Sequence, residues 1–137
     1  MKRAMTAARV ALADDVPGVR VAMARMLERL GHTVVCEAAN GVELIDQCSG
    51  QQVDVVFTDL DMPIMDGLAA AEELAVQGIP VILVTGHPDA DKIVIQHEPV
   101  IECLTKPVAS KSLEIAIVQA LAKTKERQSR LRNSLGK

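Results

Sequence analysis

Five short apolar runs recur along the chain, and each is followed by a longer segment with a mixed apolar and polar pattern. The runs span residues 10–13, 33–36, 53–58, 81–84 and 100–104. Short runs that are apolar on both faces are typical of buried strands in a parallel sheet, and the segments between them suit crossover helices. The pattern therefore predicts an α/β chain with a doubly wound, five-stranded parallel sheet.

Helix signals fill the segments between these runs. Pro17 suits a first helical turn, Asn40 and Glu43 have the spacing of a capping box, and Asp66 is placed to cap a third helix. The segment 89–98 contains β-branched residues, but its place between two strands predicts a short helix. The residues expected to face the core from the other helices are Val19, Met23, Met26, Leu30, Leu44, Ile45, Cys48, Leu68, Ala71, Leu74, Ala75, Leu113, Ile117, Ala120 and Leu121.

Length and composition indicate one domain with an aliphatic core. The chain has 137 residues, 49% of them hydrophobic, but Phe57 is its single aromatic residue. Binding of single-stranded nucleic acid uses stacking aromatic side chains, so this composition argues against it. No signal-like apolar core follows the first residues, no stretch approaches membrane-spanning length, and the three cysteines have no metal-type spacing. We therefore expect a cytoplasmic protein with reduced thiols that acts on neither nucleic acid nor membrane.

Charge is uneven along the chain. The formal net charge is −3, but residues 123–137 hold six basic residues and one acid, which leaves −8 for the rest. A negative body with a positive tail is not the footprint of a DNA-binding domain. We expect the tail to be a solvated helix end, and contact with an acidic partner is the alternative.

Polar residues follow four of the five apolar runs at the point where each run ends. They are Asp14 with Asp15, then Asp59, Thr85 and Lys106. Carboxyl ends of parallel strands meet at one edge of the sheet, where such folds place ligands. Crowded carboxylates require a cation, and a Lys and a Thr beside them suit a phosphoryl group. Each residue alone has an ordinary alternative: helix capping for the first pair, a turn for Asp59 and Thr85, and solvation for Lys106.

The segment 59–67, Asp-Leu-Asp-Met-Pro-Ile-Met-Asp-Gly, makes the pattern more specific. With Asp14 and Asp15 before it and Thr85 and Lys106-Pro107 after it, the chain resembles the CheY-like receiver domain of two-component response regulators over residues 8–123. The resemblance implies a flavodoxin-like sheet with strand order 2-1-3-4-5. It also implies a receiver domain over residues 1–125, followed by a basic tail or helix extension over 126–137.

The resemblance further implies a role for each residue. Asp59 is the expected phosphoacceptor, which takes a phosphoryl group from a phosphohistidine on a sensor histidine kinase or histidine phosphotransfer protein. Mg²⁺ is expected on Asp15 and Asp59, with Asp14 assisting and the backbone carbonyl of Asp61 completing the protein ligands. Lys106 and Thr85 are expected to contact phosphoryl oxygens.

The implied function is phosphorelay signal transduction by a single-domain regulator whose contacts with a downstream protein change on phosphorylation. Such a domain catalyses its own phosphorylation and dephosphorylation without turning over a separate substrate.

Two positions depart from the family pattern. Cys103 stands where an aromatic residue is usual, and Val108 replaces a frequent Phe. Because cysteine cannot supply the large rotamer change of an aromatic residue, we expect output to rely on movement of segment 86–98. Side chains two places after the acceptor and after the Thr, here Asp61 and His87, are expected to tune the phosphoryl lifetime. An exposed loop position is the alternative for His87.

Two other functions remain open from the sequence. Asp59-Leu-Asp61 also resembles the nucleophile motif of haloacid-dehalogenase-type phosphatases, which form an aspartyl phosphate with Mg²⁺. That family places the motif on its first strand, whereas Asp14 and Asp15 precede it here. The other possibility is a receiver-like scaffold that is not phosphorylated.

Overall fold

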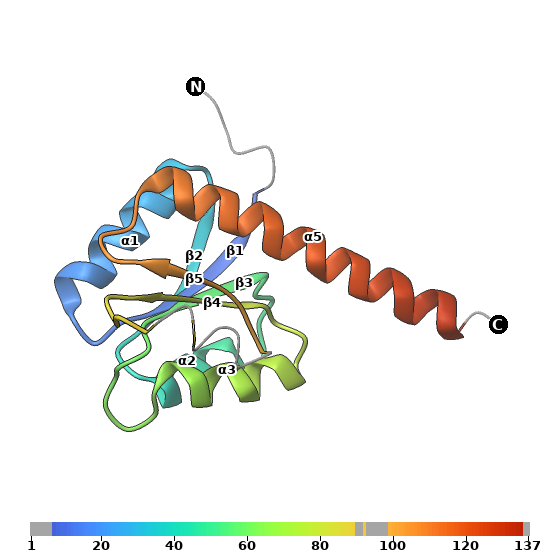
Figure 1. The fold of residues 1–137 in the computed structure, drawn as a ribbon, viewed down its shortest axis with the longest axis horizontal. Helices are drawn as coiled ribbons and strands as arrows, with labels where there is room; N and C mark the ends of the chain where they lie inside the picture. The colour runs from blue at the N-terminus through green and yellow to red at the C-terminus, as the bar shows by residue number, and fades with distance from the viewer. Residues whose placement is uncertain (1–6, 90–91, 93–98, 136–137) are drawn as a thin grey trace.

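The computed structural model describes residues 7–89, 92 and 99–135, and its centre is a single parallel sheet. The strands lie in the order β2-β1-β3-β4-β5 (Figure 1). This arrangement confirms the predicted doubly wound sheet and the implied 2-1-3-4-5 order. The strands are β1 (Arg9–Ala13), β2 (Thr33–Ala38), β3 (Val55–Thr58), β4 (Val81–Thr85) and β5 (Val100–Thr105).

Helices cover both faces of this sheet. α1 and α5 lie on one face, and α2 and α3 lie on the other (Figure 1). The helix predicted over 89–98 lies outside the described residues apart from positions 89 and 92, as does most of segment 86–98. The described helices are α1 (Pro17–Arg29), α2 (Gly41–Cys48), α3 (Gly67–Val76) and α5 (Ser110–Leu135).

Alternate strand residues build two aliphatic cores, one under each helix layer. Phe57 lies fully buried in the α1–α5 core, among side chains such as Leu12, Leu27 and Ile117. Val56 and Leu74 lie in the core under α2 and α3. Because β3 is buried along its whole length, it has no solvated face, as expected for a central parallel strand.

The predicted caps form at two helix starts. The Asn40 side chain accepts from the Glu43 backbone N–H at 2.9 Å, and Glu43 Oε1 accepts from the Ala39 N–H at 3.1 Å. The Asp66 side chain accepts from the Ala69 N–H at 2.8 Å and caps α3. These bonds satisfy backbone donors that the first helical turn leaves without intrahelical partners.

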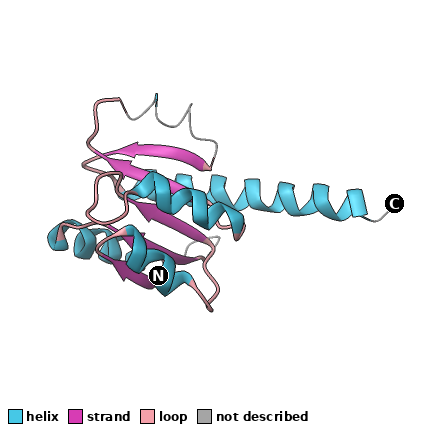
Figure 2. Ribbon diagram, turned by 90° about the horizontal axis from the view of Figure 1, so that it is seen from below, coloured by secondary structure: helices cyan, strands magenta, loops and turns pink. Residues whose placement is uncertain are grey.

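The last helix runs far beyond the residues that attach it to the core. Leu121 is partly buried against the core, whereas the residues after Thr124 are exposed and α5 projects past the sheet (Figures 1 and 2). Lys, Arg, Gln and Glu, which have high helix propensity, make up much of this part. Among the helices of the described ranges, none combines the length and apolar character needed to cross a membrane.

Candidate functional site

The polar residues predicted at strand ends do meet at one edge of the sheet. Asp14 follows β1, Asp59 follows β3, Thr85 ends β4 and Lys106 follows β5. Backbone hydrogen bonds continue the sheet ladder through these positions. The Asp59 N–H donates to the Ala13 carbonyl at 2.9 Å, and the Lys106 N–H donates to the Thr85 carbonyl at 3.1 Å. The side chains are therefore held by the sheet itself.

Three carboxylates form the acidic part of the site. Asp14, Asp15 and Asp59 each offer one oxygen, and these three oxygens all lie within 4.8 Å of one another. Asp14 is 2% exposed and Asp59 is 8% exposed, whereas Asp15 is exposed to solvent. Two of the three charges therefore have little access to water, and an ammonium or a metal must compensate them.

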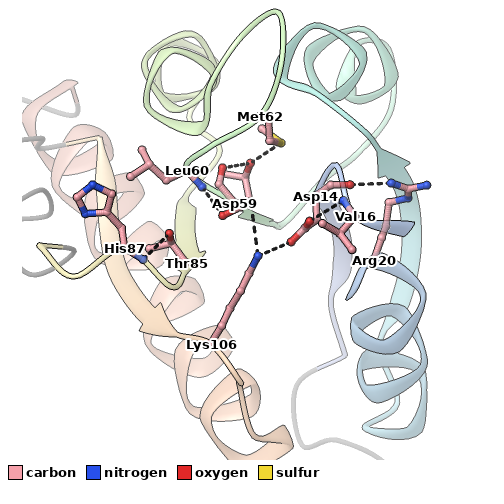
Figure 3. A network of polar contacts seen from close by, with 10 residues as sticks. Asp14, Val16, Arg20, Asp59, Leu60, Met62, Thr85, His87 and Lys106 are labelled. Carbon is pink, nitrogen blue, oxygen red and sulfur yellow. Dashed lines mark hydrogen bonds and ion pairs between the residues drawn. The ribbon is translucent and has the colours of Figure 1, made fainter. Parts of the chain in front are cut away.

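Lys106 supplies one compensating charge. Its Nζ lies 2.8 Å from Asp14 Oδ2 and 3.4 Å from Asp59 Oδ2, between the two carboxylates (Figure 3). The peptide bond to Pro107 is cis, the isomer that proline makes accessible after this Lys. Burial alone would lower the pKa of Lys106, but the hydrogen bond to Asp14 and the charges of Asp59 and Asp14 raise it above its usual value. The ammonium is therefore fully protonated at neutral pH.

Asp59 differs from Lys106, because burial has the largest effect on the pKa of its carboxyl group and is not outweighed by its neighbours. Loss of hydration raises the pKa of its carboxyl group, and neighbouring Asp14 adds to the rise. Lys106 and the Leu60 N–H, which donates to Asp59 Oδ1 at 2.9 Å, oppose the rise without cancelling it. An ionised Asp59 is thus held in a poorly solvated position, where an additional cation would be favoured.

Two supports of Asp14 were not predicted from the sequence. The Val16 N–H donates to Asp14 Oδ1 at 2.9 Å, and the Arg20 guanidinium donates to the Asp14 backbone carbonyl at 2.6 Å (Figure 3). The bond from the Val16 N–H could have been predicted, because an Asp side chain commonly accepts from the backbone N–H two residues later in the chain. Arg20 carries no such local signal, since a basic residue in an exposed first turn is ordinary.

Thr85 lies at the same edge, but its hydroxyl bonds within its own loop. The His87 backbone N–H donates to Thr85 Oγ1 at 3.1 Å, and the His87 ring points away from Asp59 (Figure 3). His87 Nδ1 accepts from the Asp89 N–H at 3.1 Å. Thr85 Oγ1 accepts in this arrangement, so its own proton can be donated toward a ligand at the sheet edge.

The loop after Asp59 includes one position that only glycine fits. A Cβ on Gly67 would overlap the backbone oxygen of Asp59, and the Gly67 N–H donates to the Leu60 carbonyl at 2.9 Å. The start of α3 is therefore packed directly against the end of β3. Asp61 lies in the same loop with an exposed side chain that does not belong to the carboxylate group.

A family model that describes the response regulator receiver domain matches residues 10–118, which is most of the chain. The chain belongs to the receiver domain family. Membership assigns this receiver to phosphorelay signal transduction, and the matches do not favour the phosphatase or scaffold alternatives.

Curated relatives include receivers within longer proteins and one of similar length. The chain is 36% identical to the tetrathionate response regulatory protein TtrR of Salmonella typhimurium over 117 residues, covering 83% of this chain and 56% of that protein. It is 31% identical to the transcriptional regulatory protein PdtaR of Mycobacterium tuberculosis, covering 86% of this chain and 58% of PdtaR. The chain thus spans little more than half of these two relatives. It is 33% identical to protein PilH of Pseudomonas aeruginosa, covering 84% of this chain and 98% of PilH.

Solved receiver structures have the same fold. A response regulator receiver domain protein from Clostridium thermocellum is 30% identical with a TM-score of 0.74, covering 86% of this chain and 97% of that one. The signal receiver domain of a modulated diguanylate cyclase from Desulfovibrio desulfuricans is 25% identical with a TM-score of 0.81, covering 89% and 99%.

Proposed function

We propose that this receiver accepts a phosphoryl group on Asp59 from a phosphohistidine of a sensor histidine kinase or histidine phosphotransfer protein. The observation that supports this most is the position of the Lys106 ammonium, 3.4 Å from Asp59 and 2.8 Å from Asp14. An Asp that only capped a turn would not need a buried acidic neighbour and a Lys from another strand.

The proposed step exchanges one phosphorus bond for another. An Asp59 carboxylate oxygen forms a bond to phosphorus while the phosphorus–nitrogen bond of phosphohistidine breaks. The electron pair of that bond goes to the imidazole nitrogen, and Asp59 becomes an acyl phosphate. The Leu60 N–H, 2.9 Å from Asp59 Oδ1, orients the carboxylate during this exchange.

The charge balance of the cluster suits Mg²⁺. Three carboxylates lie together and one ammonium contacts two of them, and oxygen ligands of this kind are those that hard divalent cations prefer. Asp15 and Asp59 would bind the ion, with Asp14 assisting and the Asp61 backbone carbonyl as a further ligand. The bound ion would neutralise negative charge that develops on the phosphoryl oxygens.

Lys106 and Thr85 complete the phosphoryl site. The Lys106 ammonium, already directed at Asp59, would pair with one phosphoryl oxygen. The Thr85 hydroxyl accepts from the His87 N–H, so its proton would be donated to another oxygen. Buried donors arranged in advance stabilise transferred charge better than water does.

We infer a cytoplasmic signalling module in which a receiver over residues 1–125 is followed by a basic tail over 126–137. Phosphorylation would change its contacts with a downstream protein. Its own phosphorylation and dephosphorylation are the only reactions that we assign to it.

The test uses acetyl phosphate as a small phosphoryl donor, with intact-protein mass as the readout. We expect one phosphoryl group to be added in the presence of Mg²⁺, none with EDTA, and none in Asp59→Asn. The matched control is Asp46→Asn, which removes an exposed acid on α2 and should be phosphorylated like the unchanged chain.

Phosphorylation of Asp59→Asn to the same extent would refute the assignment of the acceptor. Repeated turnover of a phosphomonoester would support the phosphatase alternative instead.

A further inference from the structure

Charge in this molecule is divided between the two helix layers. α2 and α3 contain four acidic residues, Glu43, Asp46, Glu72 and Glu73, and no Lys or Arg. By contrast, α1 and α5 carry nine of the 15 Lys and Arg residues. These helix pairs lie on opposite faces of the sheet, so the faces have opposite signs (Figure 1).

The basic layer continues into the projecting end of α5, residues 123–135, which we call the basic extension. Its exposed Leu131 and Leu135 lie one turn apart in a row, with 58% and 85% exposure. Helical spacing puts Lys123, Arg127 and Arg130 on one side of this row and Lys125 and Arg132 on the other. Arg130 pairs with Glu126 at 3.7 Å, and the other four have no ion-pair partner among the described residues.

The opposite layer carries a matching pattern on α2 and α3, whose exposed surface we call the acidic face. On α3, Val76 is 89% exposed and lies one turn from Glu72 and Glu73. On α2, Val42 is 39% exposed beside Glu43 and Asp46. None of these four acids has an ion-pair partner within the part of the chain that the structure describes. Each helix thus offers an exposed apolar side chain with acids beside it.

We propose that this chain self-associates by placing the basic extension of one copy on the acidic face of a second copy. The leucine row would cover an exposed valine, and the basic rows would pair with the acids beside it. The extension is about 20 Å long at 1.5 Å per residue, which is enough to follow α3 from end to end. The two surfaces differ, so the contact is heterologous. Two copies can each bind the other and form a closed dimer, or further copies can add one after another to form a chain.

Charge also disfavours two other arrangements. Pairing two basic extensions would bring five positive side chains of each copy together. Binding of the extension to nucleic acid or an anionic membrane would bring the rest of the chain, which carries a net charge of −8, close to another negative surface. The two negative charges would repel each other. The extension also has no aromatic residue to insert at a membrane surface.

The experiment measures average mass by sedimentation equilibrium on the whole chain as protein concentration rises. At low ionic strength we expect the mass to rise above the monomer value of 14.7 kDa, and to return to it in about 0.5 M salt, where charges are screened. A mass that stays at the monomer value at every concentration would overturn the proposal.

Charge-reversal variants identify the surfaces. We expect the extension variant Arg127→Glu with Arg132→Glu to be monomeric, and the face variant Glu72→Lys with Glu73→Lys to be monomeric as well. An equal mixture of the two should associate again, because each variant offers a surface complementary to the other. The control Arg25→Glu with Lys111→Glu makes the same change in net charge at exposed positions elsewhere and should associate like the unchanged chain.

Circular dichroism establishes that each variant is folded. The proposal is wrong if the control loses association as fully as the extension variant, or if the mixture of variants stays monomeric. It is also wrong if the unchanged chain remains monomeric while binding duplex DNA or anionic vesicles, since a polyanion would then be the partner of the extension.

Discussion

At Asp59, burial and the charge of Lys106 shift the carboxyl pKa in opposite directions. The folded chain raises the pKa of its carboxyl group, first through burial and then through Asp14. A raised pKa means that the folded state holds the Asp59 proton more tightly than the unfolded state does. Ionised Asp59 therefore lowers stability at neutral pH, and this penalty disappears as pH falls through the folded-state pKa.

Asp59→Asn should accordingly stabilise the metal-free chain at neutral pH. We expect Tm to rise by a few degrees in EDTA, with the difference shrinking between pH 7 and about pH 4. Mg²⁺ should raise the Tm of the unchanged chain more than that of the variant, because the variant loses a proposed ligand. Thermal melts with and without Mg²⁺ measure both effects, and an Asp59→Asn protein less stable in EDTA at neutral pH would contradict the argument.

Gly67 tests how closely α3 must approach Asp59. Gly67→Ala would place a Cβ against the Asp59 backbone oxygen, so we expect a loss of about 2–3 kcal/mol in unfolding free energy and impaired phosphorylation. Gly18→Ala is the matched control, because a Cβ there meets nothing within 4 Å and α1 gains helix propensity. Equal stability of the two variants in urea unfolding would rule out this close contact.

His87 borders Thr85 through its backbone, so its side chain can be altered without removing that bond. We predict that His87→Ala changes the rate of autodephosphorylation, because the ring accepts from the Asp89 N–H at 3.1 Å and so orders the loop after Thr85. His87→Asn keeps a side-chain acceptor for the Asp89 N–H, so its rate should lie closer to that of the unchanged chain. Identical rates in all three proteins would remove His87 from the mechanism.

Among the elements, α5 is fixed to the body by a contact between residues far apart in sequence. His32 Nδ1 accepts from the Ala8 N–H at 3.1 Å, which leaves Nε2 as the donor to Glu114 Oε1 at 2.8 Å. The His32 side chain is fully buried, and Glu114 lies on α5. The His32 ring thus joins the residues directly before β1 and β2 to the last helix.

Glu114→Ala would leave the buried Nε2–H without its carboxylate. We expect a loss of about 1–3 kcal/mol in unfolding free energy, because an unsatisfied buried donor retains its full desolvation cost. Glu126→Ala on the same helix breaks only an exposed pair and should change stability by less than about 0.5 kcal/mol. Urea unfolding compares the two, and similar losses would show that the His32 contact contributes little.

Helix faces show where a local pattern is ambiguous. In α1 the sequence predicts Val19, Met23, Met26 and Leu30 as the inward face, whereas the buried residues are Met23, Ala24 and Leu27. The expected residues other than Met23 pack at the border of the core instead. Apolar residues occupy two adjacent rows on this helix. The row with Ala24 and Leu27 is buried, whereas the row with Met26 and Leu30 is only partly buried.

Across the whole molecule, the sheet and its polar edge could be predicted because strand and site signals coincide in sequence. Asp14, Asp59 and Lys106 each directly follow a strand that the apolar runs predict, so their convergence follows from parallel topology. Other features depend on partners that only the fold supplies. The contact of His32 with Glu114 joins residues 82 positions apart, and Arg20 reaches a backbone carbonyl that no local pattern marks.

The opposite signs of the two helix layers give the molecule an electric dipole moment directed across the sheet. A charged protein that approaches in solution will rotate this molecule before the two touch, turning the layer of opposite sign toward itself. Acidic and basic proteins will therefore approach different faces of this receiver. The edge with Asp59 lies between the two layers, so it faces neither the basic nor the acidic side of the molecule.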